Sequence, residues 1–140
     1  MPIGTKNAVI PGGGCHHIAL QVRDMNESLK FYRDVLGMSL VAQFGSPERR
    51  IFLLDMGDGS HMELFDPTPD SPKPGDVAAN EPVIHFALTT TDTKSATEHV
   101  RAAGYTITVE PKTVDLGAMT VTIAFFDGPN GESIEFFQVL

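Results

Sequence analysis

The chain has 140 residues, 41% of them hydrophobic and 20% charged, which suits a folded domain with its own core. Its net charge of −8 and its lack of Lys or Arg runs exclude a basic nucleic-acid-binding face. Residues 1–14 contain no stretch as long or as apolar as a membrane anchor or signal peptide. We therefore expect neither a nucleic-acid partner nor a membrane partner.

Two further expectations follow from the same composition. Residues 1–14 are rich in glycine, and we expect them to form a flexible leader. Cys15 is the single cysteine, so an internal disulfide is excluded and a reducing, cytoplasmic location is favoured.

A first module is predicted over residues 15–66, in the order strand, helix and three strands. Apolar residues alternate from 18 to 22, which predicts a strand with His17 on the face opposite the apolar one. Asp24 and Glu27 form the capping pair of a helix that ends at Gly37. Strands follow over 38–44, 50–56 and 61–65, and Glu63 lies on the non-apolar face of the last of them.

Residues 67–82 contain five prolines and few apolar side chains, which predicts a linker. A second module then follows over residues 83–140. Its first strand has Ile84, Phe86 and Leu88 on one face and His85 on the other. A shorter helix is predicted from Asp92 to Gly104, with strands over 105–110, 119–127 and 133–139.

The two modules repeat the same chemical pattern. A histidine opens the first strand (His17, His85), and an aspartate follows seven residues later. A glutamate sits in the last strand of each module, 46 residues after His17 and 50 residues after His85. Neither half is long enough to be stable alone, so each is expected to complete its core against the other half or against a second chain.

Four residues of metal-binding type therefore occupy repeat-related positions: His17, Glu63, His85 and Glu135. Two imidazoles and two carboxylates suit one divalent ion such as Ni, Co, Zn, Mn or Fe, and a six-coordinate ion would keep open positions for a substrate. Taken singly, each residue is more typical of an ordinary strand side chain. Together they predict a metal site, because each of the four is expected on the face of its strand that points away from the apolar residues.

Other polar residues give weaker signals. His61 shares the face of Glu63 and could support the site from outside, although its position beside a turn favours solvation. His16 has the opposite strand phase to His17 and is expected on the helix side or at the strand end. Arg49 and Arg50 could bind an anionic substrate, but adjacent charges beside a turn are usually solvated.

The chain also resembles a known family. The segments HIALQVRDMNESLKFYRDVLGM, HMELFDP and FFDGPNGESIEFF are similar to the vicinal oxygen chelate superfamily, which includes glyoxalase I, bleomycin and fosfomycin resistance proteins and extradiol dioxygenases. The resemblance implies an α+β fold in which two βαβββ modules form a curved, mostly antiparallel sheet around a central cleft. It places the metal positions on His17, Glu63, His85 and Glu135, and it implies a homodimer.

Within the superfamily, we expect a metal-dependent lyase or isomerase of glyoxalase I type. It would act on a small carbonyl or thioester substrate by moving a proton next to the carbonyl through an enediolate or enolate, with Glu135 as the first choice of base and Glu63 as the second. Glyoxalase I usually has an Arg where this chain has Gln21, and an Asn where it has Asp66 and Pro67.

Three other activities of the superfamily stay open at this point. MELFDPTPDSP resembles methylmalonyl-CoA epimerase. An Fe(II) dioxygenase would use His17, His85 and Glu135, although Glu63 would then occupy a position that oxygen needs. The third is an antibiotic-resistance transferase or binding protein.

Overall fold

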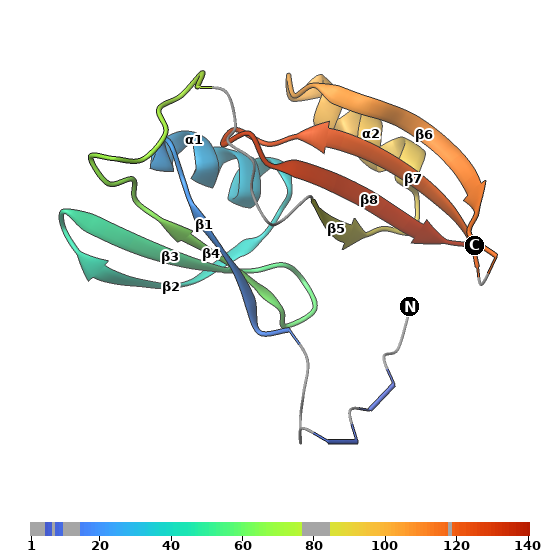
Figure 1. Cartoon of the computed structure of the whole chain (residues 1–140), viewed down its shortest axis with the longest axis horizontal. Coiled ribbons are helices and arrows are strands. Elements are labelled where there is room, and N and C mark those ends of the chain that lie inside the picture. The colour runs from blue at the N-terminus through green and yellow to red at the C-terminus, as the bar shows by residue number, and fades with distance from the viewer. Residues whose placement is uncertain (1–4, 7, 10–14, 77–84, 118) are drawn as a thin grey trace. The chain divides into compact units, whose positions relative to one another are not determined.

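The computed structural model describes residues 5–6, 8–9, 15–76, 85–117 and 119–140. The chain divides into two compact units, Met1–Ser71 and Pro72–Leu140, and each has the element order strand, helix and three strands (Figure 1). The boundary between the units falls inside the proline-rich segment 67–82. Among the described residues no helix has the length and apolar character needed to cross a membrane. Most of the predicted leader, residues 77–82 of the linker and residues 83–84 of the second module, including Ile84, lie outside the described residues.

The first unit is one four-stranded sheet covered by one helical segment. Its strands are β1 (His17–Gln21), β2 (Ser39–Ser46), β3 (Arg49–Asp55) and β4 (His61–Phe65), in the spatial order β1-β4-β3-β2. The first and last strands in sequence, β1 and β4, pair in parallel, and the other pairs are antiparallel.

The second unit repeats this topology. Its strands are β5 (Phe86–Thr89), β6 (Ile107–Asp115), β7 (Thr120–Asp127) and β8 (Ser133–Val139), in the order β5-β8-β7-β6. Again the first and last strands pair in parallel and the others antiparallel. Two mostly antiparallel sheets, each with a helix, confirm the predicted α+β fold with two βαβββ modules.

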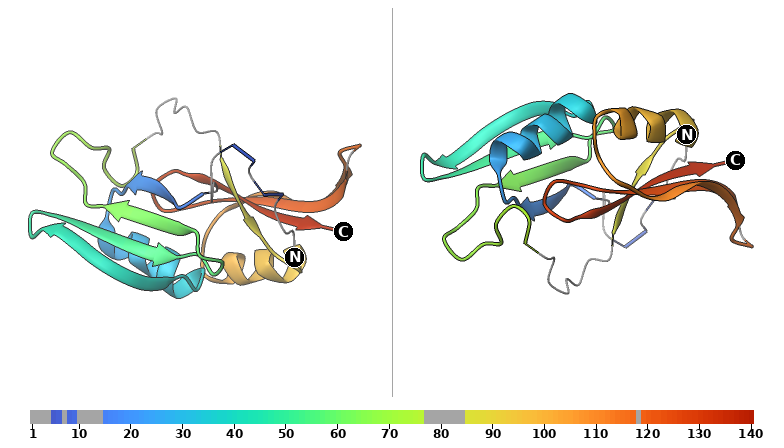
Figure 2. Two further views of the ribbon diagram at one scale, coloured as in Figure 1. Left: turned by 90° about the horizontal axis from the view of Figure 1, so that it is seen from below. Right: turned by 90° about the horizontal axis from the view of Figure 1, so that it is seen from above.

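The helix of each unit lies on one face of its own sheet (Figure 2). In the second unit it is α2 (Thr93–Ala102), which Asp92 caps by accepting a hydrogen bond from the Ser95 amide. In the first unit α1 (Met25–Leu29) is capped in the same way by Asp24. Both caps were predicted from the sequence, and they fix where each helix starts relative to the preceding strand.

The first helix differs from the regular α-helix that its spacing predicts. After α1 it continues as a π-helix, η1 (Lys30–Val35), in which the Leu36 amide donates to the carbonyl of Phe31, five residues earlier. Phe31 and Tyr32 are adjacent in sequence, yet both are fully buried. The wider turn of the π-helix allows two consecutive aromatic side chains to enter the core. A regular α-helix, whose apolar stripe is narrower, is less suited to bury two neighbouring residues.

The apolar faces of the two sheets pack against these helices. The fully buried hydrophobic side chains of the first unit are Val22, Phe31, Tyr32, Leu54, Met62 and Leu64, and those of the second are Val100, Val121, Ala124, Phe126 and Ile134. On β4 the buried residues Met62 and Leu64 alternate with His61, Glu63 and Phe65, which are half-buried. The opposite faces of the sheets are therefore available for polar chemistry.

One strand is longer than predicted. The sequence predicts a strand that ends at Glu110 before a loop containing Pro111, whereas β6 runs through Pro111 to Asp115. The pairing of β6 with β7 shifts register between Val109 and Lys112, so the proline sits in an irregular stretch of an edge strand. Proline is tolerated there because its missing amide is not needed for a regular ladder.

A buried carboxylate joins the two ends of the hairpin formed by β3 and β4. Asp66 accepts hydrogen bonds from the Arg50 backbone amide at 2.8 Å and from Arg50 Nε and Nη2 at 2.8 and 3.1 Å. The Asp66 amide in turn donates to the Arg50 carbonyl. These hydrogen bonds lower the pKa of Asp66 below its ordinary value. Arg50 is therefore part of the fold and is not free for a substrate.

Replacement of this carboxylate should change the pH dependence of stability. Because the folded pKa of Asp66 lies below the unfolded value of about 3.9, its contribution is complete above that pH and is lost as pH falls through the folded pKa. We expect Asp66→Asn to lower the free energy of unfolding by about 1–2 kcal/mol at pH 7, with part of the effect screened because Arg50 is partly exposed. Urea unfolding from pH 7 to pH 3 should show this difference shrinking below pH 4.

The matched control is Asp34→Asn, which removes an exposed carboxylate paired with its sequence neighbour Arg33. Exposed pairs of this kind contribute little to stability, so this variant should unfold like the native protein at every pH. If the loss of unfolding free energy in Asp66→Asn stayed constant down to pH 3, the lowered pKa of Asp66 would not be the source of its stabilising effect.

Candidate metal centre

The parallel pairing of β1 with β4 brings a histidine and a glutamate to one face of the first sheet. Ala19 lies directly opposite Glu63, and His17 is two residues before Ala19 on the same face. The distance from His17 Nε2 to Glu63 Oε2 is 3.7 Å. The His17 side chain is 41% exposed and that of Glu63 is 14% exposed, so the carboxylate is shielded while the imidazole is open to solvent.

The second sheet repeats the arrangement in the same register. Ala87 lies opposite Glu135 across β5 and β8, and His85 stands two residues before Ala87. His85 Nε2 lies 3.1 Å from Glu135 Oε2, and the Glu135 side chain is 8% exposed. The His85 ring also packs edge-on against Phe125, with ring centroids 5.2 Å apart. Each unit therefore contributes one imidazole and one shielded carboxylate.

The structure pairs the four predicted ligands two by two. Within the described ranges, no three His, Cys, Asp or Glu side chains form a group able to hold a metal ion. The donor chemistry within each pair nevertheless suits a divalent cation. With metal–ligand bonds of about 2.0–2.2 Å, neighbouring donor atoms lie roughly 3–3.5 Å apart, close to the His–Glu separations of 3.1 and 3.7 Å.

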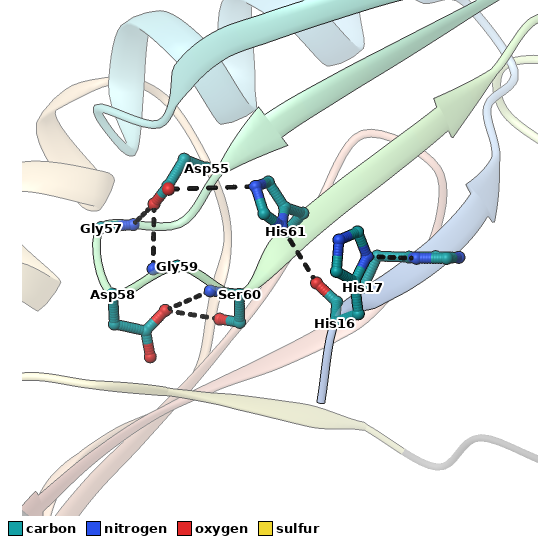
Figure 3. Close-up of polar contacts among 8 residues, drawn as sticks. All are labelled: His16, His17, Asp55, Gly57, Asp58, Gly59, Ser60 and His61. Carbon is teal, nitrogen blue, oxygen red and sulfur yellow. Dashed lines mark hydrogen bonds and ion pairs between the residues drawn. The ribbon is translucent and has the colours of Figure 1, made fainter. Parts of the chain in front are cut away.

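Two further histidines lie beside His17 in the first unit (Figure 3). His16 Nδ1 is 2.9 Å from His17 Nδ1, and the rings of His16 and His61 are stacked with centroids 4.8 Å apart. His61 Nδ1 lies 3.1 Å from the His16 carbonyl oxygen, and its Nε2 is 3.9 Å from Asp55 Oδ2. β1 begins at His17, so His16 lies just before the strand, the strand-end position given as the alternative to the helix side.

The tight turn before β4 holds His61 in this position. Asp55 accepts hydrogen bonds from the amides of Gly57 and Gly59, and Asp58 accepts from the Ser60 amide and hydroxyl (Figure 3). Gly59 has a φ of 88°, a left-handed conformation that favours glycine. The adjacency of His16 and His17, together with His61 after a Gly-rich turn, was the available sequence signal for this cluster.

The other candidates from the sequence lie in different surroundings. Arg49 sits over the Phe65 ring, 5.3 Å from its centroid. His99 is in the last turn of α2 and is exposed. Cys15 is also exposed, and its thiol lies 3.8 Å from the His17 carbonyl oxygen.

The family model of the glyoxalase/bleomycin resistance protein/dioxygenase superfamily matches residues 14–136. The chain belongs to this superfamily. The duplicated module and the fold described above are those of the vicinal oxygen chelate proteins, as the sequence segments had indicated.

Several curated relatives are named as lactoylglutathione lyases. The chain is 35% identical to the lactoylglutathione lyase of Haemophilus influenzae over 128 residues, which is 87% of this chain and 90% of that enzyme. It is 32% identical to a probable lactoylglutathione lyase of Vibrio cholerae over 124 residues, 87% of this chain and 88% of the relative. Among solved structures, SMU.1112c superposes with a TM-score of 0.74 at 22% identity, covering 89% of this chain and 98% of that one.

Proposed function

We propose that this superfamily member is a divalent-metal-dependent lyase of glyoxalase I type. Its substrate would be the hemithioacetal that forms from a 2-oxoaldehyde and a thiol, and its product a thioester of the 2-hydroxy acid. The observation that carries the proposal is the identical register of the two His–Glu pairs, with Ala19 opposite Glu63 and Ala87 opposite Glu135. The names of several relatives at 30–35% identity support the same activity.

In this proposal the two pairs together hold one ion, with two ligands from each module: His17, Glu63, His85 and Glu135. Nickel, cobalt, zinc, manganese and iron all accept such a mixed nitrogen and oxygen set. When bound, the ion supplies Lewis-acid stabilisation of the negative charge that develops on substrate oxygens. We further propose a cytoplasmic homodimer, as the family resemblance implies.

The proton transfer is assigned to the carboxylates. Glu135 is the proposed base because its side chain is the less exposed of the two and a shielded carboxylate is less hydrated. One Glu135 oxygen would accept the proton from the carbon bonded to sulfur and return it to the neighbouring carbon, while the hydroxyl proton passes to the neighbouring oxygen, so that no atom is gained or lost overall. Glu63 is the second choice, and its greater exposure favours a role in holding the ion.

Substitution of each glutamate should separate these roles. We expect Glu135→Gln to lower kcat by about 10²–10⁴-fold because the amide cannot accept the proton. The matched variant Glu63→Gln, at the equivalent position of the first module, should weaken metal binding and lower kcat less. Steady-state kinetics and metal content, measured on the same samples of both variants, test this prediction. Full turnover by metal-loaded Glu135→Gln would contradict the assignment of the base.

The identity of the substrate thiol needs its own test, because residues at two positions differ from those usual in glyoxalase I. Gln21 stands where an Arg is usual, and Asp66 and Pro67 stand where an Asn is usual. The Asp66 carboxylate is bound to Arg50, so it is not free to hold a thiol substrate. These differences favour acyl-thioester epimerisation as the second function, because it uses the same proton abstraction without a glutathione contact at these positions.

Assays with defined substrates distinguish the two functions. We expect metal-loaded protein to convert methylglyoxal to a thioester when glutathione is present, with the activity lost on chelation and regained on adding the ion. Without glutathione, methylglyoxal should not be consumed. Incorporation of solvent deuterium into an acyl thioester, with no turnover of the hemithioacetal, would instead support the epimerase and contradict the lyase.

A further inference from the structure

The second ring nitrogen of His17 faces another imidazole. His17 Nε2 is directed at Glu63, while its Nδ1 lies 2.9 Å from His16 Nδ1. A neutral imidazole carries one N–H and one lone pair, so a hydrogen bond between these nitrogens requires one ring to donate and the other to accept. Which ring donates determines whether His17 Nε2 carries a proton or offers a lone pair.

The distances to neighbouring groups favour donation by His17. If His16 donated, the His17 proton would sit on Nε2 and point at a carboxylate oxygen 3.7 Å away, beyond the 2.7–3.2 Å range of N–H···O hydrogen bonds. If His17 donates through Nδ1, its one proton is in a 2.9 Å contact, and the Nε2 lone pair faces the Glu63 carboxylate, with which it can share a bound cation. A metal ligand needs that lone pair.

The surroundings hold the His16 ring in place for this role. His16 stacks on His61 with an interplanar angle of 30°, and its carbonyl oxygen accepts from the His61 amide at 2.8 Å. His61 Nδ1 also lies 3.1 Å from that carbonyl, which can only accept, so this contact requires a proton on Nδ1. Asp55 then lies on the Nε2 side of His61 (Figure 3). The acceptor for His17 is thus part of an organised cluster.

We propose that His16 is a positioning residue that keeps His17 in the Nδ1–H tautomer, with its Nε2 lone pair directed to the metal. This inference rests on the proposed metal-binding role of His17. Hydrogen bonds from the non-ligating nitrogen orient metal-bound histidines and raise their basicity, and their loss typically weakens metal binding about 10–100-fold. Because His16 is exposed and water can partly replace it, we expect an effect near tenfold.

In the second module His85 has different hydrogen-bonding surroundings from those of His17. His85 Nε2 is 3.1 Å from Glu135 Oε2, within hydrogen-bond range, so without metal the proton belongs on Nε2 and is donated to the carboxylate. The residue before His85 is Ile84, which has no hydrogen-bonding side chain. The metal-free protein should therefore hold its two ligand histidines in opposite tautomers, and His85 serves as the internal reference for His17.

Nuclear magnetic resonance of the full-length, metal-free protein tests this directly. Long-range proton–nitrogen correlations of the imidazoles should show the Nδ1–H form for His17 and the Nε2–H form for His85. His16→Phe keeps an aromatic ring against His61 but removes the acceptor, so His17 should lose its preference for Nδ1–H while His85 stays unchanged. His16→Asn has an amide oxygen near the position of Nδ1 and should restore the native tautomer.

Metal titration provides the second measurement. Competition with a chromogenic chelator should show about tenfold weaker Zn²⁺ or Ni²⁺ binding by His16→Phe, with recovery in His16→Asn. The control His99→Phe, on the exposed part of α2, should bind like the native protein.

The results separate this inference from the proposed function. Native protein that binds no divalent ion would overturn the proposed function, and the tautomer measurement would then decide the role of His16 alone. An Nε2–H tautomer of His17 in the native protein overturns the positioning role. So does a His16→Phe variant with unchanged His17 tautomer and unchanged metal affinity.

Discussion

The structure depends on one pairing constraint, repeated in both units: the first strand of each module is parallel to the last. Parallel neighbours cannot be joined by a tight turn, and in each unit the helix and two strands between them form the long crossover that they need. Their register sets Ala19 against Glu63 and Ala87 against Glu135. Because strand side chains alternate between faces, the same register that buries Met62 or Ile134 presents the glutamate on the other face.

The small residue opposite each glutamate is part of this arrangement. An alanine at positions 19 and 87 leaves room for the imidazole two residues earlier to approach the carboxylate. The helices contribute from the opposite side, since Phe31 and Tyr32 in one unit and Val100 in the other complete the core. Burial on one face and polar chemistry on the other therefore come from one set of strands.

The duplicated modules are similar in backbone but differ around their histidines. His17 has an imidazole neighbour at Nδ1 and a carboxylate at 3.7 Å, whereas His85 has a carboxylate at 3.1 Å and an aromatic edge from Phe125. The two His–Glu pairs thus have the same chemistry but are oriented by different contacts.

Much of the fold could be predicted because its signals are local. Alternation on β1 and β4 and the caps Asp24 and Asp92 depend on neighbouring residues only. The π-helix η1 and the passage of β6 through Pro111 were missed because tertiary packing and a register shift decide them. The contact between His16 and His17 was missed because residues before a strand do not follow its alternation. The gathering of all four ligands on one ion remains a prediction.

Anomalous X-ray diffraction from crystals of protein loaded with Zn²⁺ or Ni²⁺ tests that gathering most directly. The account predicts one strong peak per chain, within about 2.0–2.2 Å of His17 and His85 nitrogens and of Glu63 and Glu135 oxygens. Two separate peaks, one at each His–Glu pair, or a peak that leaves either glutamate uncoordinated and turned to solvent, would contradict it.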